Sequence, residues 1–138
     1  MKVITLWEPW ASLIAIGAKR FETRSWYTQY KGEIAIHAAK VEKYPPAGVK
    51  AVMRQVGLDP LTLPYGKIVC IAELVSCVEM DSALIAQQSI MEAAVGGWEL
   101  GRYAWKLENI RVLEKPILAR GSQGFWNWTP PHDLKFTN

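Results

Sequence analysis

Four charged side chains of this 138-residue chain have types that could do chemistry together, namely Lys19, Glu22, Arg24 and Glu73. Lysine and arginine bind phosphates or base carbonyls, while a carboxylate can accept a hydrogen bond from an exocyclic amine. The alternative is a salt bridge with no further role. Three of the four lie within residues 19–24, so the sequence predicts a charged cluster suited to nucleic acid.

The elements around this cluster must hold it beyond the end of a helix. Pro9 suits the first turn of a helix over about residues 9–16, and Gly17 favours its end because glycine accepts the left-handed conformation. The following residues alternate, which predicts a strand at 21–24 or, as the alternative, a solvated edge strand whose charges discourage pairing. An extended segment would send two sets of side chains to opposite faces: Lys19, Phe21 and Thr23 to one, and Arg20, Glu22 and Arg24 to the other.

The rest of the chain has the pattern of a small mixed α/β domain. Short strands with helices outside favour a barrel, because closure removes sheet edges. We therefore expect one α+β domain over residues 1–138, with a small β-barrel of about five or six mixed strands and flanking helices. Strands are expected at 2–6, 21–24, 34–38, 67–78, 103–107 and 110–113, and helices at about 9–16, 47–56 and 82–95.

Composition and charge limit the class of protein. Half of the residues are hydrophobic and 21% are charged, which is typical of a globular domain. No apolar run approaches the roughly 20 residues of a membrane span, and the N-terminus lacks a signal-peptide layout, so we expect a cytoplasmic protein without a membrane. Residues 1–54 carry a charge balance of +5 and residues 55–138 one of −2. This asymmetry fits a polyanion such as RNA, although ordinary surface variation would look similar.

The two cysteines predict neither a metal site nor a disulfide framework. Cys70 and Cys77 are seven residues apart, so an extended strand would send them to opposite faces, and we expect two buried thiols. Zinc-ligand spacing is absent from the sequence, and no cofactor is expected. One route to a metal stays open, because Glu22, Glu73 and an RNA phosphate could together hold Mg²⁺.

Aromatic and polar residues elsewhere supply further candidates for a binding pocket. Among seven tryptophans, Trp26 and Trp126 are the better candidates for stacking on a base, with a packing role as the commoner alternative. The loop at 121–124 has a glycine at each end of Ser122 and Gln123, which lets backbone N–H groups approach an anion or simply forms a turn. His37 ends an apolar strand and is a secondary candidate, because such a residue is more often hydrogen-bonded in a core.

Several motifs in order carry a resemblance to a known family. Residues 17–24 read Gly-x-Lys-x-x-Glu-x-Arg after a Pro-Trp-Ala helix, and further matching stretches are 30–40, 66–74, 101–107 and 116–126. On these motifs the chain resembles the ASCH domain, a relative of the PUA RNA-binding fold, over nearly its whole length. The resemblance implies a PUA-like barrel that binds single-stranded RNA or a modified nucleoside or nucleotide. Some ASCH proteins are credited with ribonuclease activity, for which Lys19, Arg24, Tyr30 and Ser122 are the candidates here.

A more distant resemblance is to the bacterial N4-acetylcytidine amidohydrolases. Their Lys and Glu fall on Lys19 and Glu73, but their nucleophilic Thr falls on Glu22. Thr23 is one residue away, which in a strand means the opposite face. Without that hydroxyl an acyl-enzyme route lacks its nucleophile, and a water-based route with Glu22 or Glu73 as general base remains.

Two hypotheses of different class therefore follow from the sequence. The first is a non-catalytic reader of RNA or a modified nucleotide, and the second is a hydrolase acting on single-stranded RNA without metal or, as an alternative, on an N4-acylcytidine-type amide. We expect Lys19→Ala to abolish binding or cleavage while leaving stability nearly unchanged. The sequence does not predict the oligomeric state. The catalytic candidates are Lys19, Glu22, Glu73 and Tyr30, and the binding candidates are Lys19, Arg24, Trp26, His37, Tyr103, Ser122, Gln123 and Trp126.

Overall fold

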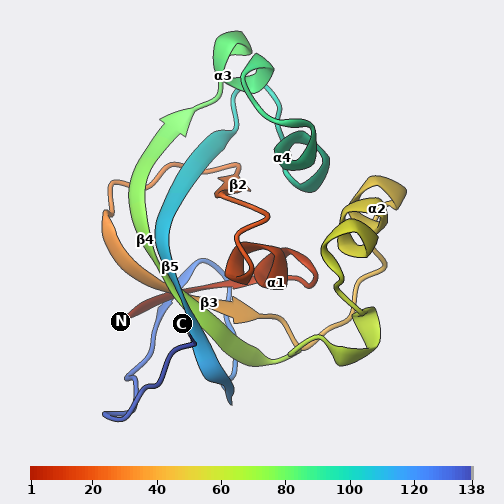
Figure 1. Cartoon of the computed structure of the whole chain (residues 1–138). Coiled ribbons are helices and arrows are strands. Elements are labelled where there is room, and N and C mark those ends of the chain that lie inside the picture. Colours follow the sequence, from red (N-terminus) through yellow and green to blue (C-terminus); the bar gives the residue numbers. More distant parts are fainter. Residues whose placement is uncertain (138) are drawn as a thin grey trace.

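A six-stranded mixed sheet curls into a half-barrel in the computed structural model, which describes residues 1–137 (Figure 1). The strand order is β2-β5-β4-β3-β1-β6, with β1 and β3 parallel and all other neighbours antiparallel. The strands are β1 (Lys2–Leu6), β2 (Phe21–Arg24), β3 (Gly32–Ala38), β4 (Lys67–Glu79), β5 (Tyr103–Leu118) and β6 (Phe125–Asn127). This architecture confirms the expected α+β fold of mixed strands with flanking helices.

The helices cover the open, concave side of the sheet (Figure 1). They are α1 (Trp10–Ala15), α2 (Ala47–Val56), α3 (Ser82–Ala86) and α4 (Ile90–Val95), with a 3₁₀ turn at Pro60–Thr62. Leu13 of α1, Val52 of α2 and Val95 of α4 belong to one apolar cluster, so these three helices form one packed layer. None of the helices in the described part of the chain has the length and apolar character that crossing a membrane requires.

The single helix expected at 82–95 is wrong, because two short helices occupy that segment. The side chain of Asp81 accepts a hydrogen bond from Leu84 N at 2.8 Å and begins α3. The hydroxyl of Ser89 accepts one from Glu92 N at 3.1 Å and begins α4. Each of these polar side chains satisfies orphan N–H groups at a helix start, which divides the segment in two.

The expected break between strands 103–107 and 110–113 is also wrong. β5 continues through Asn109, which adopts a left-handed backbone conformation with φ 50°. Asparagine tolerates this conformation better than most residues, so the strand bends at this point without ending.

The opposite-face expectation for the two cysteines fails for a related reason. The pairing of β4 with β5 shifts register at three places between Ile68 and Ser76, and each added residue reverses the alternation of faces. Cys70 and Cys77 consequently contact the same apolar cluster inside the curl of the sheet. Cys70 is buried, whereas Cys77 is only half-buried, which corrects the expectation of two buried thiols.

A second apolar cluster lies on the convex side of the sheet. Val3, Ile68 and Leu113 form its centre, and the C-terminal segment after β6 covers it. Leu113 pairs with Phe136 through an isolated bridge, so this segment packs across the sheet. The covering side chains are Trp126, Trp128, Leu134 and Phe136.

Candidate nucleic-acid cleft

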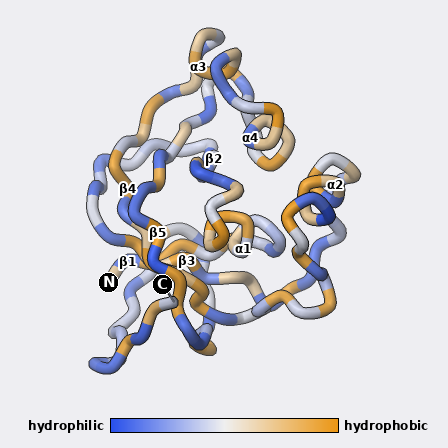
Figure 2. Tube along the Cα trace, viewed as in Figure 1, coloured by the Kyte–Doolittle hydropathy of each residue, from blue (hydrophilic) through white to orange (hydrophobic). Residues whose placement is uncertain are grey.

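A cleft of about 1530 Å³ lies between the helical layer and the ends of the strands. Its lining comes from segments far apart in the sequence, which the curl of the sheet brings together. The main lining segments are residues 5–7, 22–26, 37, 39–40, 94–97 and 118–124, together with Lys19. In Figure 2 the segment that leads into β2 is hydrophilic, next to the hydrophobic α1.

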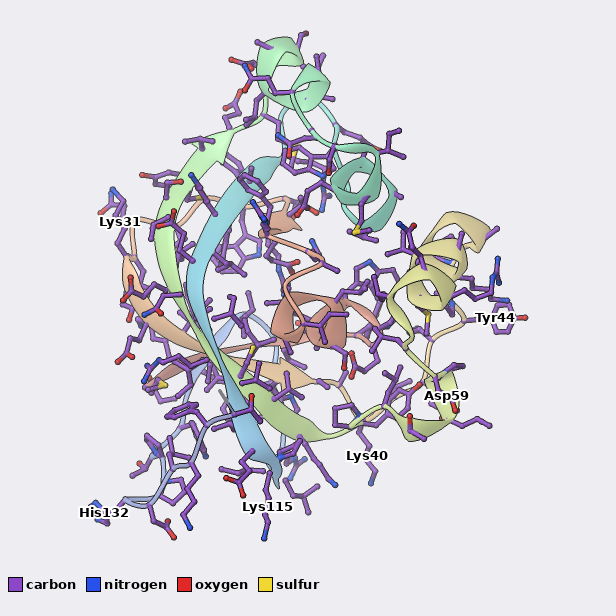
Figure 3. All side chains as sticks on the ribbon, viewed as in Figure 1. Lys31, Lys40, Tyr44, Asp59, Lys115 and His132 are labelled. Atoms are coloured by element: carbon purple, nitrogen blue, oxygen red, sulfur yellow. The ribbon has the colours of Figure 1, made fainter. Side chains whose placement is uncertain are left out.

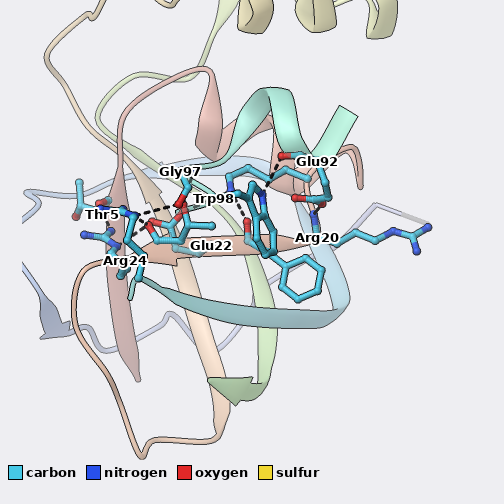
Figure 4. Close-up of polar contacts among 11 residues, drawn as sticks. Thr5, Arg20, Glu22, Arg24, Glu92, Gly97 and Trp98 are labelled. Carbon is cyan, nitrogen blue, oxygen red and sulfur yellow. Dashed lines mark hydrogen bonds and ion pairs between the residues drawn. The ribbon is translucent and has the colours of Figure 1, made fainter. Parts of the chain in front are cut away.

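The charged cluster predicted from the sequence lies in this cleft (Figure 4). Lys19 Nζ is 3.7 Å from Glu22 Oε1 and donates to the carbonyl of Phe21. Arg24 Nε is 2.8 Å from the other carboxylate oxygen of Glu22, and its Nη2 donates to the carbonyl of Thr5 at 3.2 Å. The carboxylate therefore lies between two cations.

The predicted alternation of faces is wrong for Lys19. The amides of Ala18 and Lys19 both donate to the carbonyl of Leu13 at 3.0 Å, which keeps these residues in the turn after α1. β2 begins only at Phe21, so strand alternation does not apply to Lys19. The turn brings Lys19 to the same side as Glu22.

Burial dominates the electrostatics of Lys19. Its exposed fraction is 1%, and this burial lowers the pKa of its ammonium group, while the carboxylates of Glu22 and Glu92 act in the opposite direction. Desolvation disfavours the charged form of an amine, and nearby carboxylates favour it. Lys19 is consequently held inside the protein by its acidic neighbours and offers little surface to a ligand.

Glu92 is the residue of this cluster that sequence reasoning missed. One of its carboxylate oxygens accepts from the amide of Arg20, and burial raises its pKa (Figure 4). Trp98 Nε1 donates to its main-chain carbonyl at 3.1 Å. Ser89 and Glu92 have the spacing of a capping box, in which the acid would bond back to its own helix. The carboxylate binds the start of β2 instead, so this spacing gave the wrong partner.

Thr23 faces away from Glu22, as its position in the strand predicts. Its hydroxyl accepts from Gly97 N at 2.9 Å, and its carbonyl accepts from Arg102 Nη2 at 3.2 Å. β2 pairs with β5 without a shift of register, opposite Ala104 at this position. The hydroxyl therefore does not take the place of Glu22, and it fixes the segment after α4 instead.

His37 lies in the cleft with both ring nitrogens in hydrogen bonds. Nδ1 is 3.1 Å from the hydroxyl of Thr5, and Nε2 is 2.7 Å from the carbonyl of Ala119. A carbonyl only accepts, so Nε2 carries a hydrogen. Trp126 Nε1 donates to the same hydroxyl at 2.9 Å. The imidazole thus ties the loop 119–124 to β1 and β3.

The structure brings some of the other predicted site residues together. Trp26, Ser122 and Gln123 line the cleft beside Arg24. Trp26 packs edge-on against Trp105, with ring centroids 4.7 Å apart, so most of its surface belongs to the core. Ser122 and Gln123 are exposed, and their polar groups are accessible to a ligand.

Four predicted residues are not among those that line the cleft within residues 1–137. Glu73 is exposed, opposite Glu33 in the ladder, and accepts from Asn109 Nδ2 at 3.5 Å. The Tyr30 hydroxyl donates to the carbonyl of Glu33 at 2.7 Å. Tyr103 packs edge-on against Tyr27, and Trp126 packs on the convex-side cluster. Glu22 and Glu73 therefore do not share this cleft as joint metal ligands.

Comparison with known proteins adds the family. The sequence model of the ASCH domain matches residues 4–117. Activating signal cointegrator 1 of Homo sapiens is 37% identical over 82 residues, and that of Mus musculus is 33% identical over 81 residues. Each match covers 54% of this chain but 14% of the relative, so the chain spans a small part of these longer proteins.

Solved structures share the fold. ASCH from Zymomonas mobilis has a TM-score of 0.56 and 20% sequence identity, and covers 99% of this chain and 87% of its own. A mutant form of the same protein has a TM-score of 0.53 and 21% identity, and covers 99% of this chain and 89% of its own. These identities carry the fold alone. The family model covers most of the described sheet, and on that ground the chain belongs to the ASCH domain family.

Proposed function

We propose that the cleft binds single-stranded RNA or a modified nucleotide, with Arg24 as its main contact. The observation that carries this proposal is the position of the Arg24 guanidinium, which lies in the cleft with its side chain 23% exposed. Glu22 and the carbonyl of Thr5 hold the group from behind. A fixed guanidinium suits bidentate contact with a phosphate or a base carbonyl.

Lys19 supports Arg24 without contacting the ligand. Because its side chain is buried, its role is to fix the carboxylate of Glu22, which in turn orients the arginine. A carboxylate held by two cations recognises a base amine through its remaining lone pairs more readily than it removes a proton. Lys19 is therefore a positioning residue in this proposal.

The opposite wall of the cleft offers neutral polar groups. Ser122 and Gln123 are exposed in the loop that His37 anchors, and they can bond to a phosphate or a sugar. Trp7 and Trp10 add aromatic surface to the lining. Only unpaired bases can lie against such groups, which favours a single strand over a duplex.

Hydrolysis is the second candidate, and one observation favours it. Burial lowers the pKa of Lys19, which enlarges the fraction of uncharged amine that could accept a proton. In cleavage of RNA without metal, this amine would take the 2′-hydroxyl proton as that oxygen attacks the phosphorus and the 5′-oxygen leaves. Hydrolysis of an acylated cytidine amide would instead use water, because the Thr23 hydroxyl is bound to Gly97.

The experiment compares binding and cleavage in the presence of a chelator. Labelled single-stranded RNA is titrated with the wild type, with Arg24→Gln and with Arg111→Gln, a matched control because Arg111 also pairs with a glutamate, Glu33. We expect salt-dependent binding, weakened about tenfold or more in Arg24→Gln and unchanged in Arg111→Gln. Gel analysis of the RNA and chromatography of N4-acetylcytidine report the two hydrolytic activities.

Each outcome separates the alternatives. Binding without products identifies a reader, and cut RNA or released cytidine identifies the corresponding hydrolase. Equal RNA affinity of wild type and Arg24→Gln, with equal thermal unfolding, contradicts the role of Arg24. Failure of the wild type to bind any single-stranded RNA contradicts the proposal as a whole.

A further inference from the structure

We infer that a bound RNA strand continues out of the cleft over a second site, the rim surface, formed by Trp7, Lys43, Tyr44 and Lys50. This inference rests on the proposed function, because the strand is the one held at Arg24. It adds a location for nucleotides beyond the cleft and the chemistry that recognises them, which is stacking of unpaired bases beside lysines.

The parallel pairing of β1 and β3 explains why these residues meet. Leu6 pairs with Ala38 at the ends of the two strands, and the amide of Ala39 donates to the carbonyl of Leu6 at 2.8 Å. Parallel strands end at the same edge of a sheet. The segment that starts at Trp7 and the segment 39–46 therefore leave that edge side by side.

Two lysine–aromatic pairs occupy this edge. Lys43 Nζ lies 4.4 Å from the ring centroid of Trp7, and Lys50 Nζ lies 3.4 Å from that of Tyr44. Trp7 is 52% exposed and Tyr44 is 88% exposed, so neither ring packs into the core. A lysine covers only one face of a ring, and a base can stack on the open remainder while the ammonium group meets a phosphate.

The charge around the rings has the sign that a nucleic acid requires. Residues 39–54 contain four cations and one acid, Glu42. Such a patch attracts phosphates at a distance and releases counterions on contact. The four cations are Lys40, Lys43, Lys50 and Arg54.

The rim surface is continuous with the cleft. Trp7, Lys40 and Pro46 are part of the cleft lining, and Lys43 lies over Trp7. Tyr44 points outward beyond α2, with Lys40 below it in the same view (Figure 3). A strand that leaves the cleft past Trp7 thus meets Lys43 first and Tyr44 next.

The length of the RNA distinguishes this site from the cleft. Fluorescence anisotropy measures binding of labelled single strands of about three and about twelve nucleotides, since only the longer one can reach both places. We expect Tyr44→Ala to weaken binding of the longer strand about tenfold and to leave the shorter one unchanged. Tyr44→Phe keeps the ring and should keep the affinity.

A second variant tests the charge. Lys43→Gln should lower the dependence of binding on salt concentration by about 0.7 per lost contact, the value for single strands. Lys31→Gln is the matched control, because Lys31 lies on the opposite side of the molecule from Tyr44 (Figure 3). We expect it to leave the salt dependence unchanged.

Three results would overturn the inference. Equal affinity of Tyr44→Ala and wild type for the longer strand contradicts the rim surface, while loss of binding in Arg24→Gln would still support the cleft. Equal affinity for a duplex of the same length contradicts stacking of unpaired bases. Absence of binding to either strand length contradicts both the inference and the proposed function.

Discussion

Gly121 packs so closely on His37 that a Cβ atom at position 121 would lie 2.8 Å from Cε1 and 2.9 Å from Nδ1 of the imidazole. The ring cannot move aside without loss, because Thr5 and Ala119 engage its two nitrogens. The glycine therefore lets the loop 119–124 rest directly on β1 and β3. This contact gives His37 an architectural role in the cleft.

We expect Gly121→Ala to displace this loop, lowering the free energy of unfolding by about 1–3 kcal/mol as an overpacked contact does. RNA affinity should fall as well, since Ser122 and Gln123 move with the loop. Gly48→Ala is the control, because nothing lies near a Cβ at that helical position. Thermal unfolding and anisotropy measure both effects, and equal behaviour of the two variants would contradict the close contact.

Lys19→Ala is expected to destabilise the protein, which replaces the expectation of nearly unchanged stability. The substitution leaves the buried carboxylates of Glu22 and Glu92 without this cation, and breaking a buried pair costs about 3–5 kcal/mol. Denaturant unfolding of Lys19→Met, Glu92→Gln and the double variant measures the coupling. We expect the double variant to lose less stability than the sum of the single losses. Additive losses would show that the two residues do not interact.

Glu8 should make stability depend on pH. It is 1% exposed, and burial raises its pKa above the ordinary value of 4.5, although Ser12 donates to it from both its amide and its hydroxyl. Between these two pKa values the folded chain binds more protons than the unfolded chain. The free energy of unfolding therefore falls as pH rises through that window.

Glu8→Gln should remove this contribution, so the variant gains stability relative to the wild type as pH rises from about 4.5 to about 8. Some slope should remain, because burial also raises the pKa of Glu92. Denaturant unfolding at a series of pH values measures the difference, with the exposed Glu114→Gln as control. Parallel curves for Glu8→Gln and wild type would contradict the role of Glu8.

The two thiols should differ in reactivity. Burial raises the pKa of Cys70 to about 12, and it also raises the pKa of Cys77, which is half-buried. The thiolate is the reactive form, and access limits its attack. We expect a maleimide at about pH 8 to label Cys77 before Cys70, as read by peptide mass spectrometry. Labelling of both at equal rates would indicate that the sheet opens around Cys70.

Local patterns in the sequence were sufficient for most elements of the fold. Alternation at 21–24, the prolines before α2 and the glycine after it are local signals, and the structure has a strand and a helix at those places. β6 was missed because its three residues include no alternating apolar run and gain their order by pairing with β1. Pairing of that kind depends on distant residues, which a single sequence does not reveal.

The charged cluster was predictable for the same reason, since Lys19, Glu22 and Arg24 are neighbours in sequence. Glu73 was not, because its position depends on the register of β4 with its neighbours, and that register shifts at bulges. Glu92 joins the cluster through the fold of residues 80–102 over β2. Its only local signal was the capping-box spacing, which points to a different partner.

The segment that carries Glu92 leaves and rejoins the sheet at neighbouring points. Glu79 and Tyr103 are partners in the ladder of β4 and β5, so a short hairpin turn could connect them directly. Residues 80–102 are thus an addition to that hairpin, and they supply Gly97 and Val95 to the wall of the cleft. Related domains can exchange this addition to select other ligands while the six strands stay as they are.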